Sequence, residues 1–143
     1  MTAVVIDSNV LIASHNEDDE RYDSSDAIVS GIDHGTLPEA HVTEYVVAEV
    51  LNLLHGRYSH ELALDTYERL DHGTGFRLVH TTEDDFARAV ELFYRFDGIA
   101  FVDAVLAAYM NRTDIEYLYS LDDDFDALES VSRLQTATNP FAP

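Results

Sequence analysis

The fold of this chain is decided by residues 3–12, which read AVVIDSNVLI. The stretch opens with four apolar residues and then reaches Asp7. A short apolar run that ends at a polar turn is typical of a strand buried on both faces in a parallel sheet. Asp7 would then lie at the carboxyl end of that strand, where ligands bind in open α/β sheets. A second interpretation is equally open at this point, namely that Asp7, Ser8 or Asn9 caps the helix that follows.

Length and composition indicate a single domain. The 143 residues suffice for an ordinary hydrophobic core, and the absence of cysteine excludes disulfides and thiolate metal sites. The start of the chain lacks the features of a signal peptide, and no apolar run approaches the roughly 18 residues of a membrane span. We therefore expect a soluble, cytoplasmic protein whose one domain covers residues 1–143, with a loose C-terminal tail over 137–143.

The charge balance is extreme. The chain has 28 acidic residues against 8 basic ones, every basic residue is arginine, and the formal net charge is -20. Such a surface repels RNA phosphates at ordinary salt, whereas at about 1 M salt the Debye length falls to about 3 Å and screens the repulsion. The composition therefore predicts a halophilic protein. Intrinsic disorder is disfavoured because 46% of the residues are apolar.

Strand and helix patterns alternate along the rest of the chain. A polar run over 14–21 is expected to be an exposed loop. Helices are predicted over 22–34, from Thr43 to about Leu54, over 60–71, from Thr82 to about Phe96 and from Ile99 to about Tyr109, and strands over 37–42, 76–79, 116–120 and 131–134. This alternation is typical of an α/β protein.

Further acids fall at strand ends or on helices that enter the sheet. Glu49 lies at the edge of an apolar helical stripe, Asp103 in the first turn of an alanine-rich helix, and Asp122 directly after a strand. Each has an ordinary interpretation by itself, such as stabilisation of a helix start by Asp103. If they converge with Asp7, however, the cluster needs a cation, because the chain has no lysine to neutralise it. Oxygen ligands without cysteine suit Mg²⁺ or Mn²⁺, which can promote phosphodiester hydrolysis by activating water.

Four motifs carry these acids in a fixed order. They are VIDSNVL at 5–11, TEYVVAEVL at 43–51, FVDA at 101–104 and SLDDDF at 120–125. Each motif is weak alone, but the four in this order and spacing resemble a known family, the PIN-domain nucleases, and within it the VapC-type toxins of toxin–antitoxin pairs. The resemblance covers essentially the whole chain. It implies a three-layer α/β/α fold with a five-stranded parallel sheet.

The resemblance also implies roles for the acids. Asp7 and Asp103 are implied as the central ligands of Mg²⁺ or Mn²⁺, with Glu49 and Asp122 as supporting ligands that act directly or through water. Together these four form the expected catalytic tetrad. Asp124 either joins them or contributes only surface charge.

Small polar residues accompany the acids in the same motifs. Ser8, Asn9 and Ser120 match positions where the family keeps groups that hold carboxylates or phosphate in place. One departure concerns the stretch 98–102, which reads GIAFV, whereas many relatives carry serine or threonine shortly before the third acid. One supporting contact to Asp103 is therefore in doubt.

The predicted function is a Mg²⁺-dependent endoribonuclease that cleaves structured RNA such as tRNA or rRNA. The family further implies a toxin that forms a homodimer and is blocked by a small antitoxin. Two alternatives remain within the fold, an RNA-processing nuclease outside toxin–antitoxin systems and a non-catalytic RNA-binding or scaffold protein. The second is disfavoured because a site without catalysis has no physical reason to keep like charges together. A haloacid-dehalogenase-like phosphatase is disfavoured because it needs a second aspartate where this chain has Asn9, and a lysine.

Overall fold

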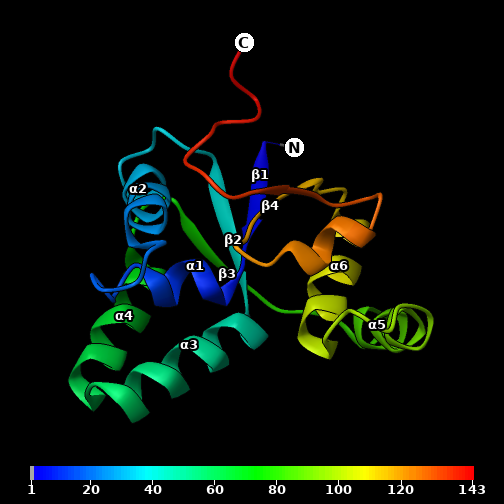
Figure 1. The fold of residues 1–143 in the computed structure, drawn as a ribbon, viewed down its shortest axis with the longest axis horizontal. Coiled ribbons are helices and arrows are strands. Elements are labelled where there is room, and N and C mark those ends of the chain that lie inside the picture. The colour runs from blue at the N-terminus through cyan, green and yellow to red at the C-terminus, as the bar shows by residue number, and fades with distance from the viewer. Residues whose placement is uncertain (1) are drawn as a thin grey trace.

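The computed structural model describes residues 2–143 (Figure 1). Its strands are β1 (Ala3–Ile6), β2 (Glu39–Thr43), β3 (Phe76–Val79), β4 (Tyr117–Tyr119) and β5 (Ser132–Leu134). Its helices are α1 (Ser8–Ala13), α2 (Tyr22–Asp33), α3 (Glu44–Arg57), α4 (His60–His72), α5 (Glu83–Arg95), α6 (Phe101–Thr113) and the 3₁₀ helix η1 (Asp123–Ala127). Every predicted element is present, and most boundaries differ from the prediction by one to three residues.

The five strands form one parallel sheet, as predicted, and their order is β3-β2-β1-β4-β5. Strand β1 lies at the centre, where Val5 pairs with His41 of β2 on one side and with Leu118 of β4 on the other. The chain builds outward from β1 to β3 and then returns to the other side of β1. The strand order therefore reverses between β1 and β4, and ligands of open α/β sheets bind at this kind of crevice.

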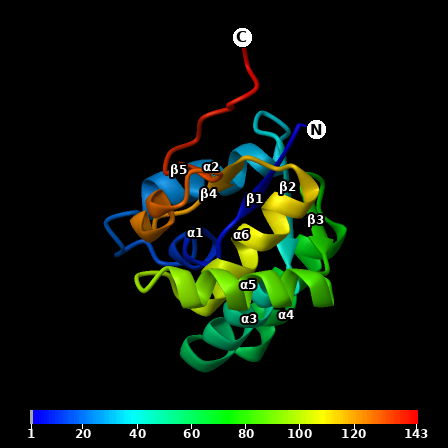
Figure 2. The ribbon, with the colours of Figure 1, turned by 90° about the vertical axis from the view of Figure 1, so that its right-hand side faces the viewer.

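Helices cover both faces of the sheet, which gives the three layers expected. Figures 1 and 2 show α1 and α2 on one side and α5 and α6 on the other, with α3 and α4 packed together as a hairpin. All four residues of β1 are buried, so its apolar run forms a strand covered on both faces. No helix within residues 2–143 is long and apolar enough to cross a membrane.

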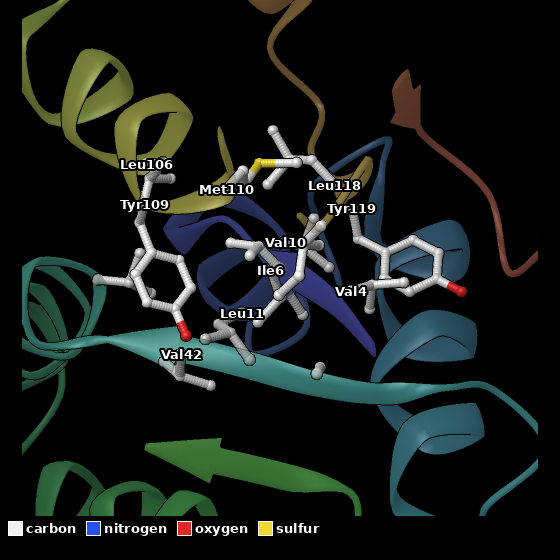
Figure 3. Close-up of a cluster of buried hydrophobic side chains, with 14 of the residues drawn as sticks. Val4, Ile6, Val10, Leu11, Val42, Leu106, Tyr109, Met110, Leu118 and Tyr119 are labelled. Carbon is white, nitrogen blue, oxygen red and sulfur yellow. The ribbon is translucent and has the colours of Figure 1, made fainter. Parts of the chain in front are cut away.

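Helix α6 contributes a long buried run to the core. Every residue from Asp103 to Met110 is buried, because the alanines at 104, 107 and 108 let the helix backbone approach its neighbours. Figure 3 shows the core that this packing creates, with Leu106 and Met110 of α6 beside side chains of β1, α1 and β4. Asp103 of α6 and Asp7 at the end of β1 are both buried, and the charge of Asp7 acts on Asp103.

The C-terminal segment touches β4. Residues 137–143 contain no helix or strand, and all but 139 and 140 are exposed. The Tyr119 hydroxyl donates a hydrogen bond to the Thr138 carbonyl at 2.6 Å, and the Phe141 ring meets the Tyr117 ring edge-on with centroids 5.4 Å apart. Both partners belong to β4, so two contacts join the segment to that strand.

The turn before β3 supplies a test of the fold. Gly75 adopts φ +95°, and a Cβ at this position would collide with the carbonyl oxygen of Ile32. We expect Gly75→Ala to lower the free energy of unfolding by about 2–3 kcal/mol, since strain and collision act together. Gly56→Ala is the matched control, because nothing lies near its added methyl and alanine favours the interior of α3. Equal urea midpoints for the two variants would contradict this account.

Candidate active site

Asp7 lies where the strand order reverses. Its backbone N–H donates to the Tyr119 carbonyl at 2.9 Å, so the ends of β1 and β4 are held together. Oδ1 of Asp7 accepts the Ser8 N–H at 2.8 Å and caps α1, while Oδ2 accepts from the Ser120 hydroxyl at 2.8 Å. The two interpretations of Asp7 from the sequence are therefore compatible, since it caps a helix and also lies at the carboxyl end of β1. One carboxylate oxygen starts the helix, and the other faces the site.

Ser120 and Asn9 link the fourth motif, residues 120–125, to Asp7. The Ser120 Oγ accepts the backbone N–H of Asp122 at 3.0 Å while it donates to Asp7. The Asn9 side chain donates to Asp7 Oδ2 at 3.3 Å and accepts the N–H of Leu121 at 3.1 Å. These bonds fix the carboxylate of Asp7 and the backbone of residues 121 and 122.

Glu49 reaches the same site from α3. It is exposed, as its place at the edge of an apolar stripe indicated, and its Oε1 accepts the Ser8 hydroxyl at 3.3 Å. Ser8 thus links Glu49 to the start of α1. The two residues lie 41 positions apart in the chain, so only the packing of α1 against α3 brings them together.

Asp103 lies in the first turn of α6 and is buried. Burial, then the charges of Asp7 and Asp122, and a hydrogen bond with Asp122, raise the pKa of Asp103 to about 8, and Glu49 adds to the same effect. Burial also raises the pKa of Asp7 to about 6, although its hydrogen bonds from Ser120 and Ser8 oppose the shift. The four predicted carboxylates therefore lie close enough to repel one another.

The same carboxylates have the donor chemistry of a hard cation site. No ion pair within residues 2–143 joins any of the four to an arginine or histidine, and their close partners are neutral N–H and O–H groups or one another. Carboxylate oxygens are the ligands that Mg²⁺ and Mn²⁺ prefer, although among the acids of residues 2–143 only Asp122, Asp123 and Asp124 have oxygens that all lie within 4.8 Å of one another. The donor chemistry of these four residues therefore suits a divalent metal ion.

Asp124 lies next to Asp122 rather than at the centre of the tetrad. Its N–H donates to Asp122 Oδ1 at 3.0 Å, and carboxylate oxygens of residues 122, 123 and 124 lie within 4.8 Å of one another. The carboxyl of Asp122 raises the pKa of Asp124. Asp123 and Asp124 are exposed, so this turn carries dense negative charge at the rim of the site.

The stretch before Asp103 bears out the departure noted in its sequence. Ala100 is the N-cap residue of α6 and offers no side-chain hydrogen bond to the helix. A serine or threonine there would supply one. Asp103 is therefore positioned by the packing of α6 and by the other acids.

Sequence reasoning missed two arginines beside this site. Arg133 of β5 donates from Nη1 to the Ser120 carbonyl at 3.3 Å and from Nε and Nη2 to Asp126, both at 3.0 Å. Arg21, from the loop before α2, lines a cavity with Arg133 next to Asp122. No motif indicated either residue, because they lie 112 positions apart and meet only through the order of the strands.

The fold and the site define an α/β protein with an acidic centre at the β1/β4 crevice, and comparison with known proteins identifies the class. The sequence model of the PIN domain matches residues 4–130. The chain therefore belongs to the PIN domain family. No curated protein matches it significantly.

Several solved structures are similar to this chain. The VapC20 toxin of Mycobacterium tuberculosis, described as cleaving the sarcin–ricin loop, has a TM-score of 0.75 and 26% identity over 88% of this chain and 95% of its own. VapBC2 of Rickettsia felis, bound to DNA from its promoter, has a TM-score of 0.67 and 12% identity over 92% of this chain and 97% of its own. VapBC-1 of Haemophilus influenzae has a TM-score of 0.67 and 13% identity over 92% and 96%, respectively. The last two show likeness of fold alone.

Proposed function

We propose that this protein is a Mg²⁺- or Mn²⁺-dependent endoribonuclease that hydrolyses phosphodiester bonds in structured RNA. The observation that carries the proposal is the convergence of Asp7, Glu49, Asp103 and Asp122 at the sheet crevice without any cationic partner within residues 2–143. Membership of the PIN domain family and likeness to a toxin described as cleaving the sarcin–ricin loop support it. That likeness favours ribosomal RNA over tRNA as the first substrate to test.

Each residue would have its own role in such a site. Asp7 and Asp103 would hold the ion from β1 and α6, and Glu49 and Asp122 would complete its surroundings directly or through water. A bound divalent ion supplies activation of water and neutralises charge on the phosphate. In hydrolysis the water oxygen bonds to phosphorus, the bond to the departing nucleotide oxygen breaks, and that oxygen takes up a proton. Ser120 keeps Asp7 oriented throughout, because its hydroxyl is itself fixed by the N–H of Asp122.

The proposed biological role is that of the toxin of a toxin–antitoxin pair. Two of the similar structures are complexes whose names include both VapB and VapC. By analogy we propose a cytoplasmic homodimer that is inhibited by a small antitoxin protein. A short reading frame next to the gene for this chain would support the assignment.

The direct test is cleavage of RNA. Total RNA is incubated with the protein in molar KCl with Mg²⁺ or with EDTA, and new RNA ends are mapped. We expect a small number of defined ends in Mg²⁺ and none in EDTA. Equal cleavage in both conditions, or none in either, would contradict the proposal.

The acidic surface predicts an unusual dependence on salt. Because protein and RNA are both strongly negative, we expect the cleavage rate to rise by about tenfold from 0.1 M to 1 M KCl before any fall, opposite to the usual counterion-release trend. The rate is measured at fixed Mg²⁺, with circular dichroism at each salt concentration to show that the protein is folded. A rate that declines steadily from the lowest salt at which the protein is folded would count against adaptation to high salt.

A further inference from the structure

A cavity of about 470 Å³ opens directly beside the acidic site. Two of its lining residues, Asn9 and Asp122, belong to the network around Asp7, so the cavity begins one side chain away from the proposed reaction centre. The rest of the lining consists of Arg21, Leu121, Asp123, Arg133 and Gln135. A polynucleotide that places one phosphate at the tetrad would extend past this cavity.

The cavity places two arginines beside the acidic site. Only 8 of the 143 residues are basic, yet two of them line this one cavity. Guanidinium groups match phosphate oxygens with two parallel hydrogen bonds, and phosphate contacts position nucleic acids on proteins. Asp122 and Asp123 on the same lining oppose a phosphate, so the two arginines decide whether RNA can lie here.

The two arginines differ in how firmly they are held. The Arg133 side chain is only 13% exposed and is fixed by Asp126 and by the Ser120 carbonyl, so it forms a rigid wall. The Arg21 side chain is 50% exposed, and its guanidinium donates to Asp19 alone among residues 2–143. Because half of the Arg21 side chain is in solvent, Arg21 is the one of the two arginines that can exchange its carboxylate partner for a phosphate.

We propose that this cavity binds a backbone phosphate of the RNA next to the one that is cleaved, with Arg21 as the mobile contact and Arg133 as the fixed wall. The inference rests on the proposed function, since it concerns the same substrate. It gives a protein of net charge -20 two arginine contacts for RNA at the edge of the site.

The test measures RNA binding rather than cleavage. A sarcin–ricin loop RNA oligonucleotide is titrated against the Asp103→Asn protein in Mg²⁺ and 0.3 M KCl, with and without Arg21→Gln. We expect Arg21→Gln to weaken binding about tenfold, the lower end for a hydrogen bond between charged groups. The slope of log K against log salt should become more positive by about 0.7, because one attractive phosphate contact on a single strand is lost. Arg21→Lys keeps the charge and should recover part of the affinity.

Arg88→Gln provides the matched control. Arg88 is also half exposed and also paired with a nearby acid, Glu91, but it lies on α5 and does not line the cavity. It should change the affinity less than twofold. Equal weakening by the two glutamine variants, an unchanged affinity for Arg21→Gln or no recovery by lysine would each overturn the proposal. Cleavage by the wild-type protein in Mg²⁺ against EDTA is followed separately, so failure of the proposed function is distinguished from failure of this subsite.

Discussion

Replacing Asp103 with asparagine is expected to lower the rate of RNA cleavage by about 10³-fold or more, which corresponds to about 4 kcal/mol of lost transition-state stabilisation. The amide is nearly the size of the carboxylate, so α6 should pack as before. It cannot supply the negative charge that holds a divalent ion, however, and Asp103 is the most deeply embedded member of the repelling group after Asp7. The rate is measured with RNA in Mg²⁺, and circular dichroism checks that the variant is folded.

Asp65→Asn is the control for this experiment. Asp65 is an exposed residue of α4, and its replacement removes one negative charge from the same protein without touching the tetrad. Its cleavage rate should stay within about twofold of wild type, as expected for a surface position. A folded Asp103→Asn protein that cleaves RNA at the wild-type rate would remove Asp103 from the catalytic site.

The elements of this fold were predictable because their patterns are local. The apolar run of β1 is buried on both faces, and the alanine-padded stripe after Ile99 is the central helix α6, as the sequence indicated. The boundaries were less certain. The strand expected over 37–42 occupies Glu39–Thr43, because Leu37 packs into the core from the preceding turn without pairing in the sheet. The first and last residues of a strand depend on the strands that pair with it, and the sequence of a single segment does not show that pairing.

The acids of the site could be predicted from the sequence, but the contacts between them could not. Asp7, Glu49, Asp103 and Asp122 were singled out by their place at strand ends and helix starts together with the family resemblance. Their convergence is visible only in the folded chain, where burial and mutual repulsion raise the pKa of Asp7 and Asp103. The ligand roles of the four acids and of Asp124 stay predictions.

The arginines beside the site show the limit of reading the sequence. Eight dispersed arginines gave no basic patch along the chain. Arg133 approaches Ser120 because β5 pairs with β4. Arg21 reaches the same cavity from a loop in the N-terminal part of the chain. Contacts between such distant residues depend on strand order, and local patterns carry no information about it.

The stability of the metal-free protein should fall as pH rises. The pKa of Asp103 is raised to about 8 and that of Asp7 to about 6, both above the ordinary value of 3.8. Between pH of about 4 and 8 the folded protein therefore binds more protons than the unfolded chain, and the free energy of unfolding decreases across this window. In EDTA at fixed KCl, Asp103→Asn should remove part of this penalty. We expect it to melt at least about 3 °C above wild type at pH 8, with a smaller difference at pH 5.

Adding Mg²⁺ should reverse the order of the two melting temperatures. An ion that binds only the folded site stabilises wild type by about 2.7 kcal/mol at a hundred times its dissociation constant, or about 5–10 °C for a domain of this size. Asp103→Asn should gain much less, because the site has lost a central charge, whereas Asp65→Asn should follow wild type in both buffers. Asp7→Asn should gain less stability in EDTA than Asp103→Asn, because the Asp7 carboxylate also accepts hydrogen bonds from Ser8 and Ser120 that an amide cannot fully replace. If Mg²⁺ instead raises the melting temperature of all these proteins equally, the ions bind diffusely to the acidic surface, and the tetrad is not a metal site.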